Sequence, residues 1–212
     1  MTSPIAGEPL RVLFVCTANI CRSPLMEIEA RRLAGDADIV FTSAGTHGLR
    51  AAPMDADMAT VLPAGAAEAF RSRPIDTAIL EQADLVLTAE TSHRAFILEE
   101  HAHLHRKVFT LGQFVDTIAG LPDLHGRELV AAAGRRRTPP RADGDIADPY
   151  RRGTAAVEQA AGTVSSMLSV VVPRLVGDRC CSSSSRSPSS LSFWPGFSSA
   201  SWSASPAWAA AP

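Results

Sequence analysis

The chain lacks several features that would place it in a familiar class. Its first residues hold neither the basic block nor the apolar block of a secretion signal, so we expect a cytoplasmic location. In that reducing compartment the four cysteines need not form a disulfide framework. A formal net charge of −2 gives no electrostatic drive toward nucleic acid or an anionic membrane. We therefore expect neither among its partners, and nothing in the sequence indicates an oligomeric state.

Metal-ligand spacing is also missing. Cys16 and Cys21 share one short motif, whereas the other two cysteines lie beyond the patterned part of the chain. The alternating histidines at 101–105 fall at a predicted helix-to-strand junction, which does not indicate a metal site. The sequence predicts no metal and no cofactor.

Composition changes near residue 178. From there the chain is rich in serine and proline, holds all three tryptophans and has no charged side chain after Arg186. It shows no helical or strand period, and it is too polar for a membrane span, which needs ~20 predominantly apolar residues. We predict a domain over residues 1–177 and a disordered tail over 178–212, with a binding segment as the alternative.

Before the tail, apolar runs alternate with helical patterns. Short apolar runs predict strands at residues 11–15, 38–42, 85–88 and 107–110. Helical spacing predicts helices at 24–34, from about 55, at 75–81, 91–100 and 111–118, and over a long final stretch from Val157 to Leu175. We expect Ser23 to cap the first helix and Pro173 to end or kink the last. The alternation predicts a parallel sheet with helices on both faces.

The most informative segment is VLFVCTANICRSP, residues 12–24. Cys16 ends a predicted strand, a tight polar loop follows, and Ser23-Pro24 opens a helix. Unpaired N–H groups and the helix dipole at such a loop bind a tetrahedral oxyanion, and the same field favours thiolate over thiol at Cys16. The Cys-x5-Arg spacing adds Arg22, whose planar fork suits phosphate oxygens. The motif predicts chemistry on a phosphate ester.

A phenolate leaving group needs a proton, and Asp148 is the candidate general acid because Pro149 stiffens its loop. Ser23 is expected to donate a hydrogen bond to the Cys16 sulfur. The predicted catalytic residues are Cys16, Arg22 and Asp148, and the predicted substrate-binding residues are Thr17, Ala18, Asn19, Ile20, Cys21 and Ser23, to which the family resemblance described next adds Tyr150.

These residues resemble a known family. The loop from Cys16 to Pro24 resembles the phosphate loop of bacterial low-molecular-weight protein tyrosine phosphatases, and Asp148-Pro149-Tyr150 resembles their late Asp-Pro-aromatic loop. The segments SAGT at 43–46, PMD at 53–55 and ADLVL at 83–87 are supporting matches. The resemblance covers roughly residues 10–177. It implies a flavodoxin-like, three-layer α/β fold with a four-stranded parallel sheet of order 2-1-3-4.

The resemblance also implies a function. The substrate would be phosphotyrosine in a protein, or a small aryl phosphate, hydrolysed through a phosphocysteine intermediate on Cys16. Asp148 would protonate the leaving oxygen and then activate water, Asn19 would hold the shape of the loop, and Tyr150 would form one wall of the cleft. Cys21 is the family's second motif cysteine, which can bond Cys16 reversibly under oxidation. A small apolar filler is the simpler reading of Cys21.

Two segments depart from the family pattern. Residues 70–73 read FRSR where many members carry a histidine that braces the loop asparagine, so that brace is absent or supplied differently. Residues 119–143 form a long segment that leads toward the loop of Asp148, called the acid loop below. We expect a solvated, flexible insertion there, with a cleft border that attracts acidic phosphopeptides as the alternative.

Two other functions fit the same motif. A thiol-dependent arsenate reductase uses the same scaffold, because arsenate mimics phosphate. Versions that relay a disulfide through the core need further cysteines, which residues 24–179 lack. The other alternative is a non-catalytic module that binds phosphate or phosphotyrosine.

Overall fold

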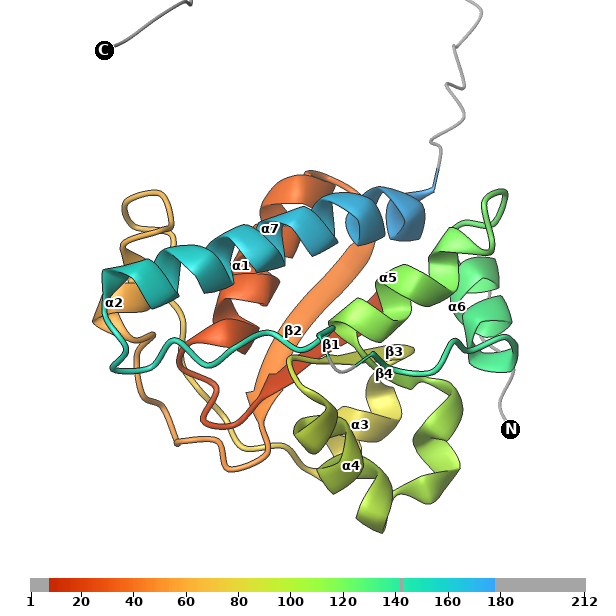
Figure 1. Cartoon of the computed structure of the whole chain (residues 1–212), viewed down its shortest axis with the longest axis horizontal. Coiled ribbons are helices and arrows are strands. Elements are labelled where there is room, and N and C mark those ends of the chain that lie inside the picture. Colours follow the sequence, from red (N-terminus) through yellow and green to blue (C-terminus); the bar gives the residue numbers. More distant parts are fainter. Residues whose placement is uncertain (1–7, 142, 178–212) are drawn as a thin grey trace, which may run out of the picture. The chain divides into compact units, whose positions relative to one another are not determined.

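The computed structural model describes residues 8–141 and 143–177, so the tail predicted over 178–212 lies outside the described residues. Four parallel strands form one sheet of order β2-β1-β3-β4 (Figure 1). The strands are β1 (Leu10–Cys16), β2 (Ile39–Gly45), β3 (Leu85–Thr88) and β4 (Val108–Thr110). The predicted fold class and strand order are confirmed.

Strand β1 is central and positions the site. It pairs with β2 from Leu10 opposite Ile39 to Cys16 opposite Gly45, and with β3 on its other side. A parallel strand buried on both faces carries a continuous apolar run, which explains the sequence before Cys16. The carboxyl ends of β1 and β2 therefore lie side by side, at the edge of the sheet where such folds bind ligands.

Helices cover both faces of the sheet. One face carries α1 (Arg22–Ala34), α2 (Ala56–Ala59), α5 (Leu111–Ala119), α6 (Gly126–Arg135) and α7 (Thr154–Val176), and the other carries α3 (Thr77–Gln82), α4 (Thr91–Glu100) and the 3-10 helix η1 (Ala102–Arg106) (Figure 1). Successive β1 side chains alternate between the layers, because Val12 and Phe14 join the core with α1 and α7, whereas Leu13 and Val15 join the core with α3 and α4.

The final helix α7 is 23 residues long and apolar enough, by length and composition, to cross a membrane. Its buried face, which includes Val164 and Leu168, packs in the core against α1. The prediction that Pro173 ends or kinks the helix is wrong as to the end, since α7 continues to Val176. Buried Val171 and Leu175, on either side of the proline, anchor this last turn to the core.

Two local predictions are corrected. The first helix begins at Arg22, its N-cap position is Cys21, and no side chain caps it. Ser23 therefore lies inside the first turn and is not the cap, and the loop N–H groups stay free of side-chain acceptors. The segment 119–143 is not a loose insertion, because α6 buries Leu129 and Ala133 in the core.

Candidate active site

The phosphate loop, residues 16–22, joins the end of β1 to the start of α1. The carbonyl oxygens of Cys16, Thr17, Ala18 and Ile20 accept hydrogen bonds of 2.8–3.1 Å from the N–H groups of Thr46, His47, Leu49 and Asp55. Within the described ranges, the N–H groups of residues 18–21 donate to no protein acceptor. Because the carbonyls are held by the surrounding segments, the loop keeps a row of unused backbone donors, which is the composition of an anion-binding nest.

Asn19 is fully buried at the centre of this loop, with a φ of 58° that asparagine tolerates better than most residues. Its Oδ1 accepts from the Arg73 N–H at 2.9 Å, so its Nδ2 is the donor to Ser23 Oγ at 2.8 Å and to Ser43 Oγ at 2.9 Å. Ser23 Oγ lies 3.0 Å from Cys16 Sγ. Since Ser23 accepts from Asn19, its own hydrogen has two acceptors within reach, the sulfur at 3.0 Å and Ala44 O at the longer distance of 3.4 Å.

The support for Asn19 replaces the histidine brace that residues 70–73 lack. The Ser43 hydroxyl donates a hydrogen bond of 2.5 Å to the buried carboxylate of Glu27, and Glu27 also forms an ion pair with Arg31. The brace is thus supplied by the Arg73 backbone, by β2 and by α1. Glu27 was not predicted from the sequence, because an i,i+4 Glu–Arg pair on a helix is typical of a solvated face.

The buried side chain of Arg22 is held by hydrogen bonds to other residues, and one of its N–H donors has no partner in the described part of the chain. Its side chain is 3% exposed, Nη1 donates to the Glu90 carboxylate and to Ile146 O at 3.0 Å, and Nη2 lies 3.4 Å from Asp148 Oδ1. Nε is buried and has no hydrogen-bond partner in the described part of the chain. Burial would raise the pKa of Glu90, but the hydrogen bond and charge of Arg22 outweigh it and lower that pKa.

The turn from Glu90 to His93, at the start of α4, makes a second contact with the phosphate loop, a hydrogen bond between His93 and Thr17. The Glu90 N–H donates to His93 Nδ1 at 3.1 Å, so Nε2 carries the proton and donates to Thr17 Oγ1 at 2.8 Å. Burial, and then the Arg22 charge, lower the pKa of His93, which keeps the ring neutral near pH 7. Neither residue was predicted from the sequence.

The acid loop is tied to the same turn. The Asp145 carboxylate accepts from the Thr91 N–H at 2.9 Å and from its hydroxyl at 3.0 Å. The Ile146 N–H donates to Ala89 O at 2.8 Å. These bonds bring Asp148, more than a hundred residues away in sequence, to Arg22.

A cavity of about 270 Å³ opens over the loop. Its lining residues are Cys16, Thr17, Ala18, Ile20, Cys21, Arg22, Leu49, Asp148 and Tyr150. Leu49 and Tyr150 are 48% and 40% exposed and give the cavity apolar walls. The structure places all the predicted site residues in or directly behind this cavity, and it adds Leu49. Their catalytic roles stay predictions.

Both motif cysteines are buried free thiols. Burial, and then the Asp55 carboxylate, raise the pKa of Cys21 to about 12. Cys21 is therefore a protonated thiol at neutral pH, unable to compete as a nucleophile. The reversible bond between Cys16 and Cys21 stays a prediction.

Among residues 8–141 and 143–177, no group of three or more histidine, cysteine or acidic side chains is placed to hold a metal. Two of the alternating histidines have local partners instead, since His103 pairs with Glu81 at 2.7 Å and His105 lies against Ala102 O at 3.2 Å.

The fold and the site define a class: a parallel α/β domain with an anion-binding loop at the carboxyl edge of its sheet, next to a cysteine. Residues 11–125, more than half of the chain, match the model of the family described as "Low molecular weight phosphotyrosine protein phosphatase". The chain belongs to this family, as the motifs predicted.

Relatives with two related activities are similar to the chain. It is 30% identical to a protein-arginine-phosphatase of Geobacillus stearothermophilus over 145 residues, which cover 67% of this chain and 80% of that protein. It is 29% identical to the low molecular weight protein-tyrosine-phosphatase Etp of Escherichia coli K12 over 154 residues, 71% of this chain and 84% of the relative. The solved structure of the YwlE arginine phosphatase from G. stearothermophilus superposes with a TM-score of 0.63 at 26% identity, covering 79% of this chain and 93% of that one. The prediction of an enzyme, a phosphoric monoester hydrolase of this family, is confirmed.

Proposed function

We propose that this protein hydrolyses phosphotyrosine in proteins through a phosphocysteine intermediate on Cys16. The observation that supports this most is the set of unused donors around Cys16, namely the N–H groups of residues 18–21 and the buried Nε of Arg22. Buried donors without partners are costly, and a phosphate dianion satisfies all of them at once.

In the first step Cys16 Sγ attacks the phosphorus, an S–P bond forms, and the P–O bond to the phenol breaks. Arg22 and the loop N–H groups stabilise the charge on the three equatorial oxygens. The incoming phosphate takes over Arg22 Nη2, which lies 3.4 Å from Asp148 in the free protein. Asp148, released from Arg22, takes up a proton from solvent and gives that proton to the departing oxygen.

In the second step Asp148 removes a proton from water, the water oxygen attacks the phosphorus, and the S–P bond breaks. The electron pair returns to Cys16 as thiolate. Ser23 stabilises this thiolate, because its hydroxyl lies 3.0 Å away and is polarised by Asn19.

The walls of the cavity favour an aromatic substrate over phosphoarginine, the substrate class of the first relative's name. Ile20, Leu49 and Tyr150 offer apolar surface for a phenol ring. A guanidinium substrate carries several N–H donors, and among the described residues Asp148 is the only carboxylate that lines the cavity. We expect kcat/KM for phosphotyrosine to exceed that for phosphoarginine by about tenfold or more, since unpaired buried donors cost ~1–3 kcal/mol each.

Rates measured on an aryl phosphate and on arsenate distinguish a phosphatase from the alternative, an arsenate reductase. We expect rapid hydrolysis of p-nitrophenyl phosphate and no thiol-dependent reduction of arsenate above background. A cytoplasmic location, and phosphoproteins as the partners, are part of the same proposal.

A leaving-group series tests the role of Asp148. Asp148→Asn should slow phenyl phosphate, a poor leaving group, far more than p-nitrophenyl phosphate, because only the poor leaving group needs the proton. Asp123→Asn, an exposed residue outside the cavity, is the matched control. Equal slowing of both substrates would count against Asp148 as the acid. Cys16→Ser should abolish turnover of both.

A further inference from the structure

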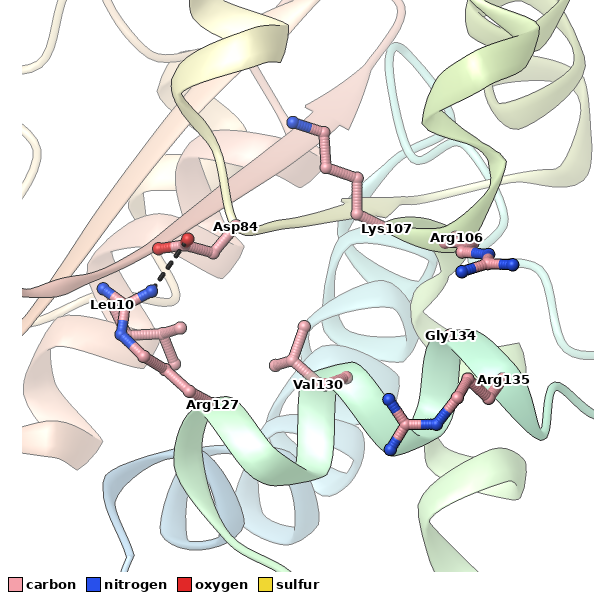
Figure 2. Close-up of a pocket in the computed structure, with 9 residues that line it drawn as sticks. Leu10, Asp84, Arg106, Lys107, Arg127, Val130, Gly134 and Arg135 are labelled. Carbon is pink, nitrogen blue, oxygen red and sulfur yellow. Dashed lines mark hydrogen bonds and ion pairs between the residues drawn. The ribbon is translucent and has the colours of Figure 1, made fainter. Parts of the chain in front are cut away.

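A second cavity of about 280 Å³, drawn in Figure 2, lies at the amino ends of β1, β3 and β4, whereas Cys16 is at the carboxyl end of β1. Leu10, the first residue of β1, contributes to its lining. A seven-residue strand rises ~20 Å, so the cavity is separate from the catalytic loop. Its chemistry is different as well, because four basic residues and one carboxylate surround it.

The single carboxylate, Asp84, is already fully used. Its Oδ2 accepts from the Arg11 N–H at 2.8 Å, and its Oδ1 accepts from Arg127 Nη1 at 2.9 Å (Figure 2). Arg127 also donates to the carbonyl oxygens of Glu8 and Pro9 at 2.9 Å. Asp84 and Arg127 therefore form a structural ion pair at one side of the cavity, and Arg127 already has acceptors within the protein.

The other three basic side chains of the cavity differ in whether they have hydrogen-bond acceptors within the protein. Lys107 is occupied, since its Nζ donates to Ala83 O at 2.8 Å and to Glu81 O at 3.1 Å, and burial lowers its pKa. Arg106 and Arg135 make no side-chain hydrogen bond or ion pair with any residue in the described ranges. Two guanidinium groups at the rim of one cavity thus lack an acceptor.

Close backbone packing brings these two arginines to the same cavity. A Cβ at Gly134 would lie 2.7 Å from Arg106 O, so glycine lets the last turn of α6 rest directly on the end of η1. Arg135 follows this glycine, and the side chains of Leu10 and Val130 give the cavity an apolar floor (Figure 2).

We propose that this cavity binds a small organic phosphate or phosphonate, with its anionic group between Arg106 and Arg135 and its apolar body over Leu10 and Val130. Guanidinium forks match the geometry of such oxyanions. The volume of about 280 Å³ lies just below the range of small-molecule sites, about 300–1,000 Å³, and this favours a compact ligand. The proposal is independent of the reaction at Cys16.

Titration with phenylphosphonate, followed by amide chemical shifts of the full chain, tests this proposal. The probe cannot be hydrolysed, and the amides of residues 17–23 report the catalytic loop separately from those of 106–107 and 131–135. We expect saturable shifts at the second set. In the double variant Arg106→Ser/Arg135→Ser the affinity at that set should fall about tenfold or more, with the loop affinity within about twofold of the unmodified chain.

Arg136→Ser is the matched control, because Arg136 is the exposed neighbour of Arg135 and does not line the cavity. It should leave both affinities unchanged. Shifts at residues 106–107 and 131–135 that do not saturate, or that persist in the double variant, would overturn the proposal. So would shifts produced there by an acidic peptide and not by phenylphosphonate, which would indicate a protein-docking surface instead. Because Arg106 and Arg135 are exposed, the double variant should retain its thermal midpoint, and this is measured alongside.

Discussion

Removal of the Glu90 carboxylate should weaken phosphate binding without touching any group that contacts the substrate. Glu90 holds Nη1 of Arg22, whose other partner on that nitrogen is Ile146 O at 3.0 Å. In Glu90→Ala the arginine, 3% exposed, loses the closer of its two ion-pair partners among the described residues, because Asp148 is 3.4 Å away on Nη2. We expect the guanidinium to turn toward Asp148 and away from the phosphate position.

The magnitude follows from the bonds involved. A hydrogen bond to a charged group contributes about 1.5–3 kcal/mol and a neutral one about 0.5–1.5 kcal/mol. Glu90→Gln keeps a hydrogen bond from the charged guanidinium and loses only the carboxylate charge, so we expect a loss of about 1 kcal/mol or less, up to roughly fivefold in kcat/KM. Glu90→Ala loses the pair altogether. Truncation of one partner of a buried pair costs about 3–5 kcal/mol, and because the Glu90 side chain is 27% exposed we expect about 2–3 kcal/mol, or roughly 30- to 160-fold.

The assay is kcat/KM on an aryl phosphate together with the inhibition constant of inorganic phosphate. Both should weaken in parallel, because both depend on Arg22, whereas a general loss of folded protein would lower the apparent kcat alone. Glu99→Gln, an exposed residue on the same helix, is the matched control and should change neither. A Glu90→Ala protein with both constants within about twofold of the unmodified chain would refute the reasoning, since a factor of two is only about 0.4 kcal/mol.

Three further predictions concern pH, packing and stability. Burial lowers the pKa of His93 in the folded state, so the unfolded chain binds a proton at this residue more readily. His93 therefore lowers the stability of the folded protein as pH falls below about 6.5. The thermal midpoint should fall more between about pH 7 and pH 5 in the unmodified chain than in His93→Asn. Gly45→Ala would place a Cβ 2.9 Å from Asn19 N and should lower kcat/KM about tenfold or more, whereas Gly162→Ala meets nothing within 4 Å and should leave kcat/KM unchanged. Leu168→Ala, in the buried face of α7, should cost about 2–5 kcal/mol in denaturant unfolding, and Val170→Ala, 46% exposed on the same helix, less than about 1 kcal/mol.

The sheet and the phosphate loop could be predicted because their signals are local. The continuous apolar run of β1, the tight loop and Ser23-Pro24 stand together in one short segment. The alternation of strands and helices then restricts the topology to a parallel sheet. Asp148 was predicted from its Pro-Tyr neighbours, and its approach to Arg22 is a tertiary fact that no spacing encodes.

The residues that the sequence did not reveal act across elements. Glu90 and His93 open α4 with no motif of their own, and their contacts to Arg22 and Thr17 exist only because β3 and β1 are neighbours in the sheet. Helix α6 was missed for a different reason. Its buried residues include small alanines, and the arginines that end it suggest solvent. Arg137, two residues beyond the end of α6, instead stacks on the Phe109 ring at 4.2 Å.

The claim that a phosphoryl group passes through one sulfur is tested most directly by rapid acid quench during turnover of an aryl phosphate, followed by mass spectrometry of the peptides. The account predicts one added phosphoryl group on the peptide that carries Cys16, lost in Cys16→Ser and retained in Cys21→Ser. Turnover without any phosphorylated cysteine peptide, or a label that follows Cys21, would contradict it.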